Sequence, residues 1–288
     1  MATKKTGDAP KGAHAGGLHI AELQTVRGPV PALMGGPKSV REMPVFYLNG
    51  EGGLSAEDPF LLELARERRV VAPFLPGFAD IPAWPDSEAR DMLDFTLFGL
   101  ETFNAAGLNQ PILIGHSMGG MIAAEMAALA PEKFARLTLI AAMGLWLDDH
   151  PVADLFSTLP PDLPGLMFHD PDVALRAMAY LGVIGGGFDP TRNDPDLFVA
   201  HVVRQARQMA NAGKLLFPIP DRGLRNRLFR ISMPVSVIWG AEDRVAPPAY
   251  GEAFAAAIPH ARLTIVPEAG HMPHWERPLL VKEAAGFG

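Results

Sequence analysis

Ser117 lies at the centre of a Gly-His-Ser-Met-Gly sequence, a pattern that exposes a serine hydroxyl as a nucleophile. Residues 111–115 form a short apolar run before it, and residues 118–129 form an Ala-rich stretch suited to a helix. At a sharp strand-to-helix turn the serine is lifted clear of its sheet, and the two glycines remove Cβ atoms that would clash there. A plain turn with Ser117 as helix cap is the alternative. The strand before it and the helix after it favour the nucleophile.

A serine nucleophile needs a general base, and His271 is the predicted one. A serine hydroxyl attacks poorly until a base takes its proton, and imidazole has a pKa near neutrality. His271 follows Gly270 directly after the last predicted strand, where open α/β sheets place their chemistry. His274 is the close competitor, three residues farther on. His116 is held within the turn beside Ser117 and is expected to point elsewhere.

The imidazole in turn needs a carboxylate that fixes its tautomer and stabilises the imidazolium. Asp243 follows the preceding predicted strand in the sequence Trp-Gly-Ala-Glu-Asp-Arg, with Glu242 as its immediate neighbour. A structural role for Asp243, capping the turn before Pro247, is the alternative. We predict Asp243 as the acid, which puts nucleophile, acid and base in the order Ser, Asp, His along the chain.

The loop after residues 44–48 is predicted to complete the site with an oxyanion hole. Acyl transfer places negative charge on an oxygen that needs preorganised donors. The backbone N–H of Met118, directly after the nucleophile, is the first donor. The second is expected from the Gly-rich stretch 49–53, with the N–H of Glu51 preferred and that of Gly50 next. A flexible turn without this role is the alternative.

Short apolar runs alternate with helical patterns along most of the chain. Strands are predicted at 18–26, 44–48, 69–74, 111–115, 137–143, 234–239 and 262–266. Helices are predicted at 56–68, 87–106, 118–129, 249–258 and 277–287. Apolar runs of this length suit strands buried on both faces. The alternation therefore predicts βαβ units in a mostly parallel sheet covered by helices.

The alternation stops after Gly144. The following stretch has Pro- and Gly-rich clusters with helical segments at 173–181 and 197–210, and it is too long for a plain loop. The N-terminus has no apolar segment of the kind found in signal peptides and is interpreted as a tail. We divide the chain into a mobile tail at 1–17, a first part of an α/β core at 18–144, a helical cap at 145–230 and a second part of the core at 231–288.

The cap region is rich in large apolar side chains, most of them expected in its own core and some lining an apolar pocket. They are Leu155, Phe156, Leu166, Met167, Phe168, Met178, Leu181 and Phe188. Arginines suited to a substrate carboxylate, or to solvated helix faces, lie at Arg176, Arg192, Arg204 and Arg207. The glycines at 185–187 are interpreted as a hinge for lid motion or a simple loop.

The composition excludes several classes of function. A net charge of −7 argues against nucleic-acid binding, which needs a basic surface. The absence of Cys excludes disulfides, thiolate nucleophiles and Cys-based metal sites, and it fits a cytoplasmic location. No apolar run approaches the roughly 18 residues that span a bilayer. We expect a small-molecule substrate, no cofactor or metal and no membrane partner, and the sequence leaves a homo-oligomer open.

Taken together, these motifs resemble those of the α/β-hydrolase superfamily, from about Leu18 to the C-terminus. The matching sequences are Gly-His-Ser-Met-Gly-Gly at 115–120, Pro-Gly-Phe at 76–78, Gly-Ala-Glu-Asp at 240–243 and Gly-His at 270–271. The resemblance implies an α/β fold: a mostly parallel sheet of about eight strands flanked by helices, with a helical cap inserted after the sixth strand. The chain looks like the branch of serine esterases and carbon–carbon bond hydrolases that act on ring-cleavage products.

The oxyanion loop departs from the family pattern. The family usually has His-Gly where this chain has Asn49-Gly50, and Glu51 follows where a small or apolar residue is commoner. A backbone donor does not depend on its side chain, so function is expected to survive. A Glu51 carboxylate facing the pocket would repel an oxyanion and anionic substrates. Ser117 argues against the dehalogenase and epoxide-hydrolase branches, whose nucleophile is Asp.

The expected function is hydrolysis of an ester or related acyl bond in a small to medium, largely apolar substrate, through an acyl-enzyme on Ser117. Cleavage of a carbon–carbon bond in a dienoic diketone-type acid is the alternative within enzymes. It would use the same Ser, His and Asp and favour a cationic group in the pocket. A non-catalytic ligand receptor on the same fold is the alternative from another class, and the complete set of three residues argues against it.

Overall fold

The computed structural model describes residues 17–37, 41–82, 84–85, 87–159, 161–178, 195–217 and 221–287. All but the last residue of the predicted tail lies outside the described residues, as do Leu181, the glycines at 185–187, Phe188 and Arg192. The mobility of the tail and the role of the Gly-rich segment stay predictions.

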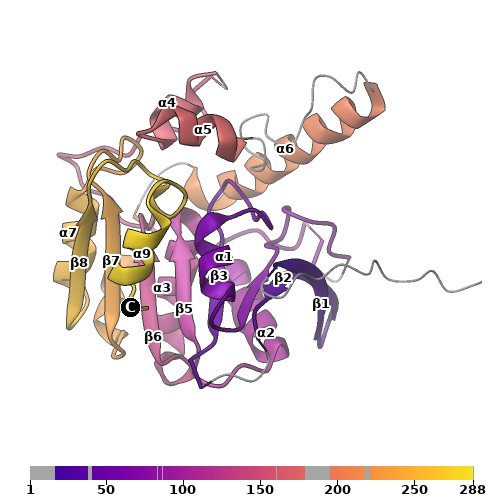
Figure 1. Cartoon of the computed structure of the whole chain (residues 1–288), viewed down its shortest axis with the longest axis horizontal. Coiled ribbons are helices and arrows are strands. Elements are labelled where there is room, and N and C mark those ends of the chain that lie inside the picture. The colour runs from indigo at the N-terminus through magenta and orange to yellow at the C-terminus, as the bar shows by residue number, and fades with distance from the viewer. Residues whose placement is uncertain are drawn as a thin grey trace, which may run out of the picture.

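An eight-stranded sheet forms the centre of the fold, in the order β1-β2-β4-β3-β5-β6-β7-β8 (Figure 1). The strands are β1 (His19–Thr25), β2 (Gly28–Gly35), β3 (Val45–Leu48), β4 (Val70–Pro73), β5 (Ile112–His116), β6 (Arg136–Ile140), β7 (Val235–Gly240) and β8 (Ala261–Val266). All neighbours from β4 to β8 pair in parallel, whereas β2 is antiparallel to β1 and β4. The predicted mostly parallel sheet is confirmed.

Helices cover both faces of the sheet (Figure 1). One face packs against α1 (Pro59–Ala65) and α9 (Pro278–Ala284), and the other against α2 (Met92–Ala106), α3 (Ser117–Leu129) and α7 (Ala249–Ala257). Successive side chains of β3 alternate between the two layers. Val45 and Tyr47 join the cluster that contains α1, whereas Phe46 and Leu48 join the one that contains α3. Burial on both faces explains the continuous apolar run.

Strand β2 is absent from the sequence prediction because Pro29 and Pro31 interrupt its apolar pattern, and proline cannot donate to a sheet ladder. The pairing with β4 covers only residues 32–35 of β2. The carbonyl of Pro31 accepts the N–H of Phe74 at 3.0 Å, so residue 31 directs its backbone polar groups away from β1. Both prolines lie outside the residues that pair with β4, so neither has to donate an N–H to that ladder.

Helices α1 and α2 begin three to five residues later than the sequence predicts, because an aspartate caps each of them. Asp58 accepts the N–H groups of Phe60 and Leu61 at 2.9 and 3.1 Å. Asp91 accepts those of residues 93 and 94 at 2.9 and 3.1 Å. Each cap satisfies two of the N–H groups that the first turn of a helix leaves without partners, and so fixes the first residue of the helix.

The Asp58 cap also makes the stability of the fold depend on pH. Burial raises the pKa of Asp58 from 3.8 to about 7, although the N–H groups of Leu61 and Phe60 oppose the shift. Because the pKa of Asp58 is higher in the folded protein than in the unfolded chain, the free energy of unfolding falls as the pH rises from about 4 to 7.

Asp58→Asn keeps the cap without the charge. We expect it to be more stable to urea than wild type at pH 8, by up to about 4 kcal/mol, and to keep only about 1.5 kcal/mol of this advantage at pH 5. An equal difference at both pH values would contradict the account.

Three helices lie together beyond one end of the sheet, between β6 and β7 in the chain (Figure 1). They are α4 (Leu163–Met167), α5 (Pro171–Met178) and α6 (Pro195–Leu216), followed by the short helices η3 (Leu224–Asn226) and η4 (Leu228–Arg230). This is the predicted helical insertion after the sixth strand; its boundaries at 145 and 230 stay predictions. Within the described ranges no helix, α6 included, has the length and apolarity needed to cross a membrane.

Candidate active site

Ser117 lies at the turn between β5 and α3 with a positive φ of 49°, a strained conformation for a residue with a side chain. The turn is possible because α3 packs directly on the loop after β3. A Cβ on Gly119 would lie 2.3 Å from the carbonyl oxygen of Leu48 and 2.5 Å from that of Asn49. Gly119 is therefore required by close backbone approach. The predicted strand–serine–helix arrangement is present, and Ser117 faces the partial positive charge of the α3 N-terminus.

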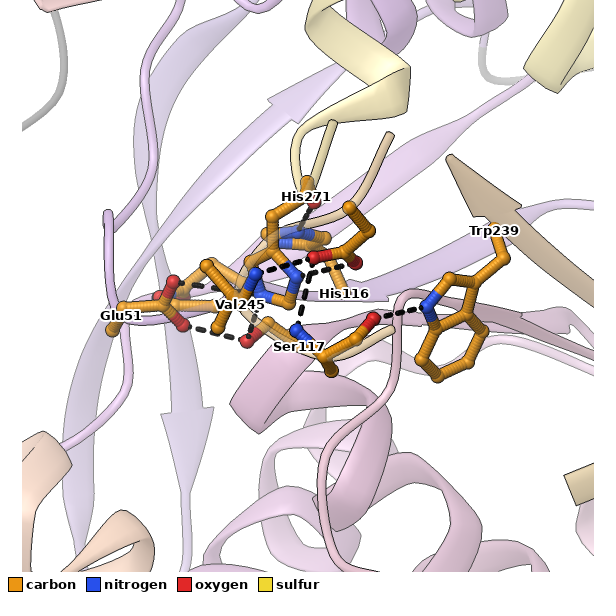
Figure 2. Close-up of polar contacts among 10 residues, drawn as sticks. Glu51, His116, Ser117, Trp239, Val245 and His271 are labelled. Carbon is orange, nitrogen blue, oxygen red and sulfur yellow. Dashed lines mark hydrogen bonds and ion pairs between the residues drawn. The ribbon is translucent and has the colours of Figure 1, made fainter. Parts of the chain in front are cut away.

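His271 and Asp243 reach Ser117 from the loops after β8 and β7. Figure 2 shows the imidazole of His271 beside Ser117. The Nε2 atom of His271 is 2.9 Å from Ser117 Oγ, and its Nδ1 is 2.8 Å from Asp243 Oδ2. All three side chains are buried. Three residues spread over more than 150 positions thus form one hydrogen-bonded chain, as the sequence predicts.

The carboxylate of Asp243 is held on both oxygens. Its Oδ1 accepts the backbone N–H groups of Val245 and Ala246 at 2.9 and 3.0 Å, and its Oδ2 accepts Nδ1–H of His271. Trp239 donates its indole N–H to the carbonyl of Ala246 at 2.7 Å and so fixes the loop to β7 (Figure 2). A carboxylate oriented in this way keeps His271 in the tautomer whose Nε2 is free to accept a proton.

The other two histidines near the site do not contact Ser117 Oγ. Nε2–H of His116 donates to the carbonyl of His271 at 2.8 Å (Figure 2). The ring of His274 lies 4.3 Å from that of His116, and its Nε2 is 3.9 Å from Asp58. Burial lowers the pKa of His116 to about 4 and that of His274 well below its ordinary value. His274 is thereby placed behind the site as a neutral packing residue rather than as the base.

Glu276 is a supporting residue that the sequence reasoning missed. It lies in α8 (Pro273–Glu276) and accepts three backbone N–H groups, from Gly270 at 2.6 Å, His169 at 2.8 Å and Asp170 at 2.9 Å. Burial raises its pKa, against the opposing effect of these hydrogen bonds. One carboxylate thus ties the loop that carries His271 to the start of α5. Its place five residues after the histidine is the only sign of it in the sequence.

The loop 49–53 packs directly on the nucleophile turn. A Cβ on Gly50 would lie 2.5 Å from Nδ1 of His116 and 3.0 Å from Cβ of Ser117. As the second residue of α3, Met118 has an N–H without an acceptor in its own helix. Both segments that were predicted to supply oxyanion donors therefore lie against Ser117. The assignment of the N–H groups of Met118, Glu51 and Gly50 stays a prediction.

The side chain of Glu51 faces the nucleophile. It is fully buried, and its Oε2 accepts the hydroxyl of Ser117 at 2.7 Å (Figure 2). Its Oε1 lies 3.9 Å from Nε2 of His271 and has no hydrogen-bond partner among the described residues. The sequence raised this orientation as a question without answering it, because the rotamer of Glu51 depends on how closely two loops approach in the folded chain.

Two acceptors lie within reach of the single proton of the Ser117 hydroxyl. They are Nε2 of His271, 2.9 Å from Oγ, and Oε2 of Glu51, 2.7 Å from Oγ. The hydroxyl donates to one of them at a time.

The charge state of His271 reflects the same surroundings. Burial lowers its pKa, but the Asp243 carboxylate and, less strongly, that of Glu51 raise it, and the net pKa lies above the ordinary value. Two buried carboxylates thus stabilise the imidazolium, which is the form of the residue after it has taken the serine proton.

The predicted cap residues divide between core and surface. Leu155, Met167 and Phe168 are buried, while Phe156 and Leu166 pack partly buried against the core. Arg176 and Arg204 are exposed, and Arg207 pairs with Asp80 at 3.8 Å. A pocket lined by these side chains stays a prediction. In the described ranges, no group of three or more His, Asp or Glu is arranged to hold a metal ion.

Three curated relatives share part of this sequence. The dihydrolipoyllysine-residue acetyltransferase component of an acetoin cleaving system from Pseudomonas putida is 30% identical over 280 residues, 87% of this chain and 66% of the relative. The chain thus spans just under two thirds of that protein. A 2-hydroxy-6-oxo-6-phenylhexa-2,4-dienoate hydrolase from Burkholderia cepacia is 28% identical over 220 residues, 72% of each chain. A pimeloyl-[acyl-carrier protein] methyl ester esterase from Aromatoleum aromaticum is 27% identical over 224 residues, 73% of this chain and 83% of the relative.

The family model described as the alpha/beta hydrolase family matches residues 45–284, a span that runs from β3 to α9. It includes the nucleophile turn, the helical insertion and the loops that carry Asp243 and His271. On this match and on the order of its strands, the chain belongs to the alpha/beta hydrolase family.

Proposed function

We propose that this chain is a serine hydrolase that cleaves an ester or related acyl bond through an acyl-enzyme on Ser117. The observation that carries the proposal is the hydrogen-bonded chain from Ser117 Oγ through His271 to Asp243, with distances of 2.9 and 2.8 Å. This is the geometry in which an imidazole takes a serine proton as the hydroxyl attacks a carbonyl carbon.

In the first step Ser117 Oγ bonds to the carbonyl carbon while its proton passes to Nε2 of His271. Asp243 stabilises the imidazolium, and the N–H groups of Met118 and of Glu51 or Gly50 hold the oxyanion. His271 then gives its proton to the leaving group. The acyl group stays on Oγ until water removes it.

An acyl substrate of small to medium size and largely apolar character is part of the proposal, because the insertion that lies over the loop of His271 is rich in apolar side chains. Small molecules rather than nucleic acids or membranes are the proposed partners, and the proposed location is cytoplasmic. Oligomeric state is outside the proposal.

Cleavage of carbon–carbon bonds in dienoic acids is less well supported. Such a substrate carries a carboxylate, whereas the charged group nearest Ser117 Oγ is the buried carboxylate of Glu51. A non-catalytic receptor role is also less well supported, because a receptor has no need of a strained serine hydrogen-bonded to a histidine.

A fluorophosphonate probe tests the proposal. We expect wild-type protein to take one label on Ser117, and Ser117→Ala to take none. Ser157→Ala is the matched control, because Ser157 is an exposed serine whose hydroxyl donates to the carbonyl of Asp154; it should label as wild type does. Turnover of p-nitrophenyl esters of increasing chain length, beside a coloured dienoate, then tests the substrate class. Absence of label on the wild-type protein would contradict the proposal.

A further inference from the structure

Glu51 places a buried carboxylate at the reacting atoms, and among the described residues it has no ion pair with a Lys or Arg. Within the described ranges its charged neighbour is His271, at 3.9 Å, and its hydrogen-bond donor is the Ser117 hydroxyl, at 2.7 Å. Its second oxygen, Oε1, is buried and without a partner there. Burying a carboxylate oxygen without a hydrogen bond costs free energy. We therefore look for its partner among the groups that enter the site during turnover.

Acylation removes the hydrogen-bond donor that Glu51 has in the resting site. Once Oγ carries the acyl group it has no proton left to donate. His271 has by then passed its proton to the leaving group, and its Nε2 is again an acceptor. The acyl-enzyme therefore presents two acceptors side by side, Nε2 of His271 and the carboxylate of Glu51, next to the ester carbon that must be attacked.

The separation of the two acceptors suits one bridging water molecule. Water has two O–H groups, and an oxygen about 2.8 Å from each acceptor spans their separation with a small angle at the water; that separation is 3.9 Å between Nε2 and Oε1. Oγ of Ser117 is 2.9 Å from Nε2 of His271 and 2.7 Å from Oε2 of Glu51, so both acceptor side chains border the atom that carries the acyl group. The two acceptors thus define a place for the nucleophile of the second step.

We propose that Glu51 is a catalytic residue of the second step, in which its carboxylate holds the water that hydrolyses the acyl-enzyme. The inference rests on the proposed function, since it requires an acyl group on Ser117. The water oxygen bonds to the acyl carbon, and one of its hydrogens passes to Nε2 of His271. The bond from carbon to Oγ then breaks, and Oγ takes that proton back. The released acid keeps the second hydrogen, the one that Glu51 held.

Competition between water and methanol tests this role. Methanol has a single O–H, which must be donated to His271, so it has no second O–H to donate to Glu51. The quantity to measure is the ratio of acid to methyl ester formed from a p-nitrophenyl ester at a fixed low methanol concentration. Glu51→Leu keeps the backbone donor of residue 51 and removes the acceptor, and we expect the ratio to fall about tenfold. Glu51→Gln retains an amide oxygen as acceptor and is expected to lie between Glu51→Leu and wild type.

Asp58→Asn is the matched control, because Asp58 is another buried carboxylate of this region that contacts His274 rather than Ser117 or His271. It should partition as wild type does. Fluorophosphonate labelling of each variant checks that its nucleophile is assembled. An unchanged ratio in Glu51→Leu, or an equal fall in Asp58→Asn, overturns the inference even if all the proteins hydrolyse the ester. Failure of the proposed function appears differently, as wild-type protein that neither takes the label nor releases p-nitrophenolate, and it overturns both.

Discussion

Replacing Asp243 by Asn is expected to lower kcat for an ester substrate by about three to four orders of magnitude while leaving the fold intact. The structure determines how the amide would sit. Oδ1 of residue 243 accepts the N–H groups of Val245 and Ala246, which only an oxygen can do. The NH₂ group of the new side chain must therefore face Nδ1 of His271.

The consequence is a histidine in the wrong tautomer. An amide that donates to Nδ1 turns this nitrogen into an acceptor and moves the imidazole proton to Nε2. With its proton on Nε2, His271 has no lone pair for the hydroxyl of Ser117, 2.9 Å away, and the first step stops. Steady-state kinetics with a p-nitrophenyl ester give kcat directly, and urea denaturation shows whether stability has changed.

Glu242→Gln is the control, since Glu242 is the adjacent carboxylate in the same loop. Glu242 accepts the N–H of Ala269 at 3.0 Å, a role that a glutamine oxygen also fulfils. We expect less than about a tenfold loss of kcat. A large loss in Glu242→Gln together with a small one in Asp243→Asn would show that the acid of the site is residue 242.

The residues that converge on Ser117 were predictable because each is marked by its position at a strand end. Parallel strands bring their carboxyl ends to one edge of a sheet, so loops far apart in sequence meet there. A Gly-flanked serine after one such strand, an aspartate after another and a Gly-His after the last are sufficient to propose the set. Their geometry agrees with the prediction, while their catalytic roles await the experiments described above.

The supporting carboxylates were less accessible to sequence reasoning. Glu276 accepts the backbone N–H groups of residues 169 and 170, more than a hundred positions away. No local sequence pattern indicates such a contact. The direction of Glu51 depends on the close approach of its loop to the nucleophile turn, which leaves a Cβ no room at Gly50. Strand β2 was missed for a different reason: its prolines break the pattern, and their tolerance depends on where the pairing with β4 ends.

The close packing of α3 on the end of β3 leads to the second large prediction, which concerns stability. Gly119→Ala adds one methyl group to α3, and alanine is the better helix former by about 1 kcal/mol. We nevertheless expect a loss of about 3 kcal/mol or more, because the new Cβ would lie 2.3 Å and 2.5 Å from the carbonyl oxygens of Leu48 and Asn49. Backbone atoms of a central strand cannot yield as a flexible side chain does. Either α3 moves away from β3, carrying Ser117 out of reach of the loop 49–53, or the domain unfolds.

Gly213→Ala separates this steric effect from helix propensity. Gly213 lies in α6, and a Cβ there meets the ring of Phe156 at 3.5 Å, an ordinary contact distance. The same substitution should therefore raise the free energy of unfolding by up to about 1 kcal/mol. Urea denaturation of the two variants is expected to give changes of opposite sign. Should Gly119→Ala prove as stable as wild type, α3 would not be pressed against the β3 loop, and the close packing that brings the predicted oxyanion donors to Ser117 would have to be abandoned.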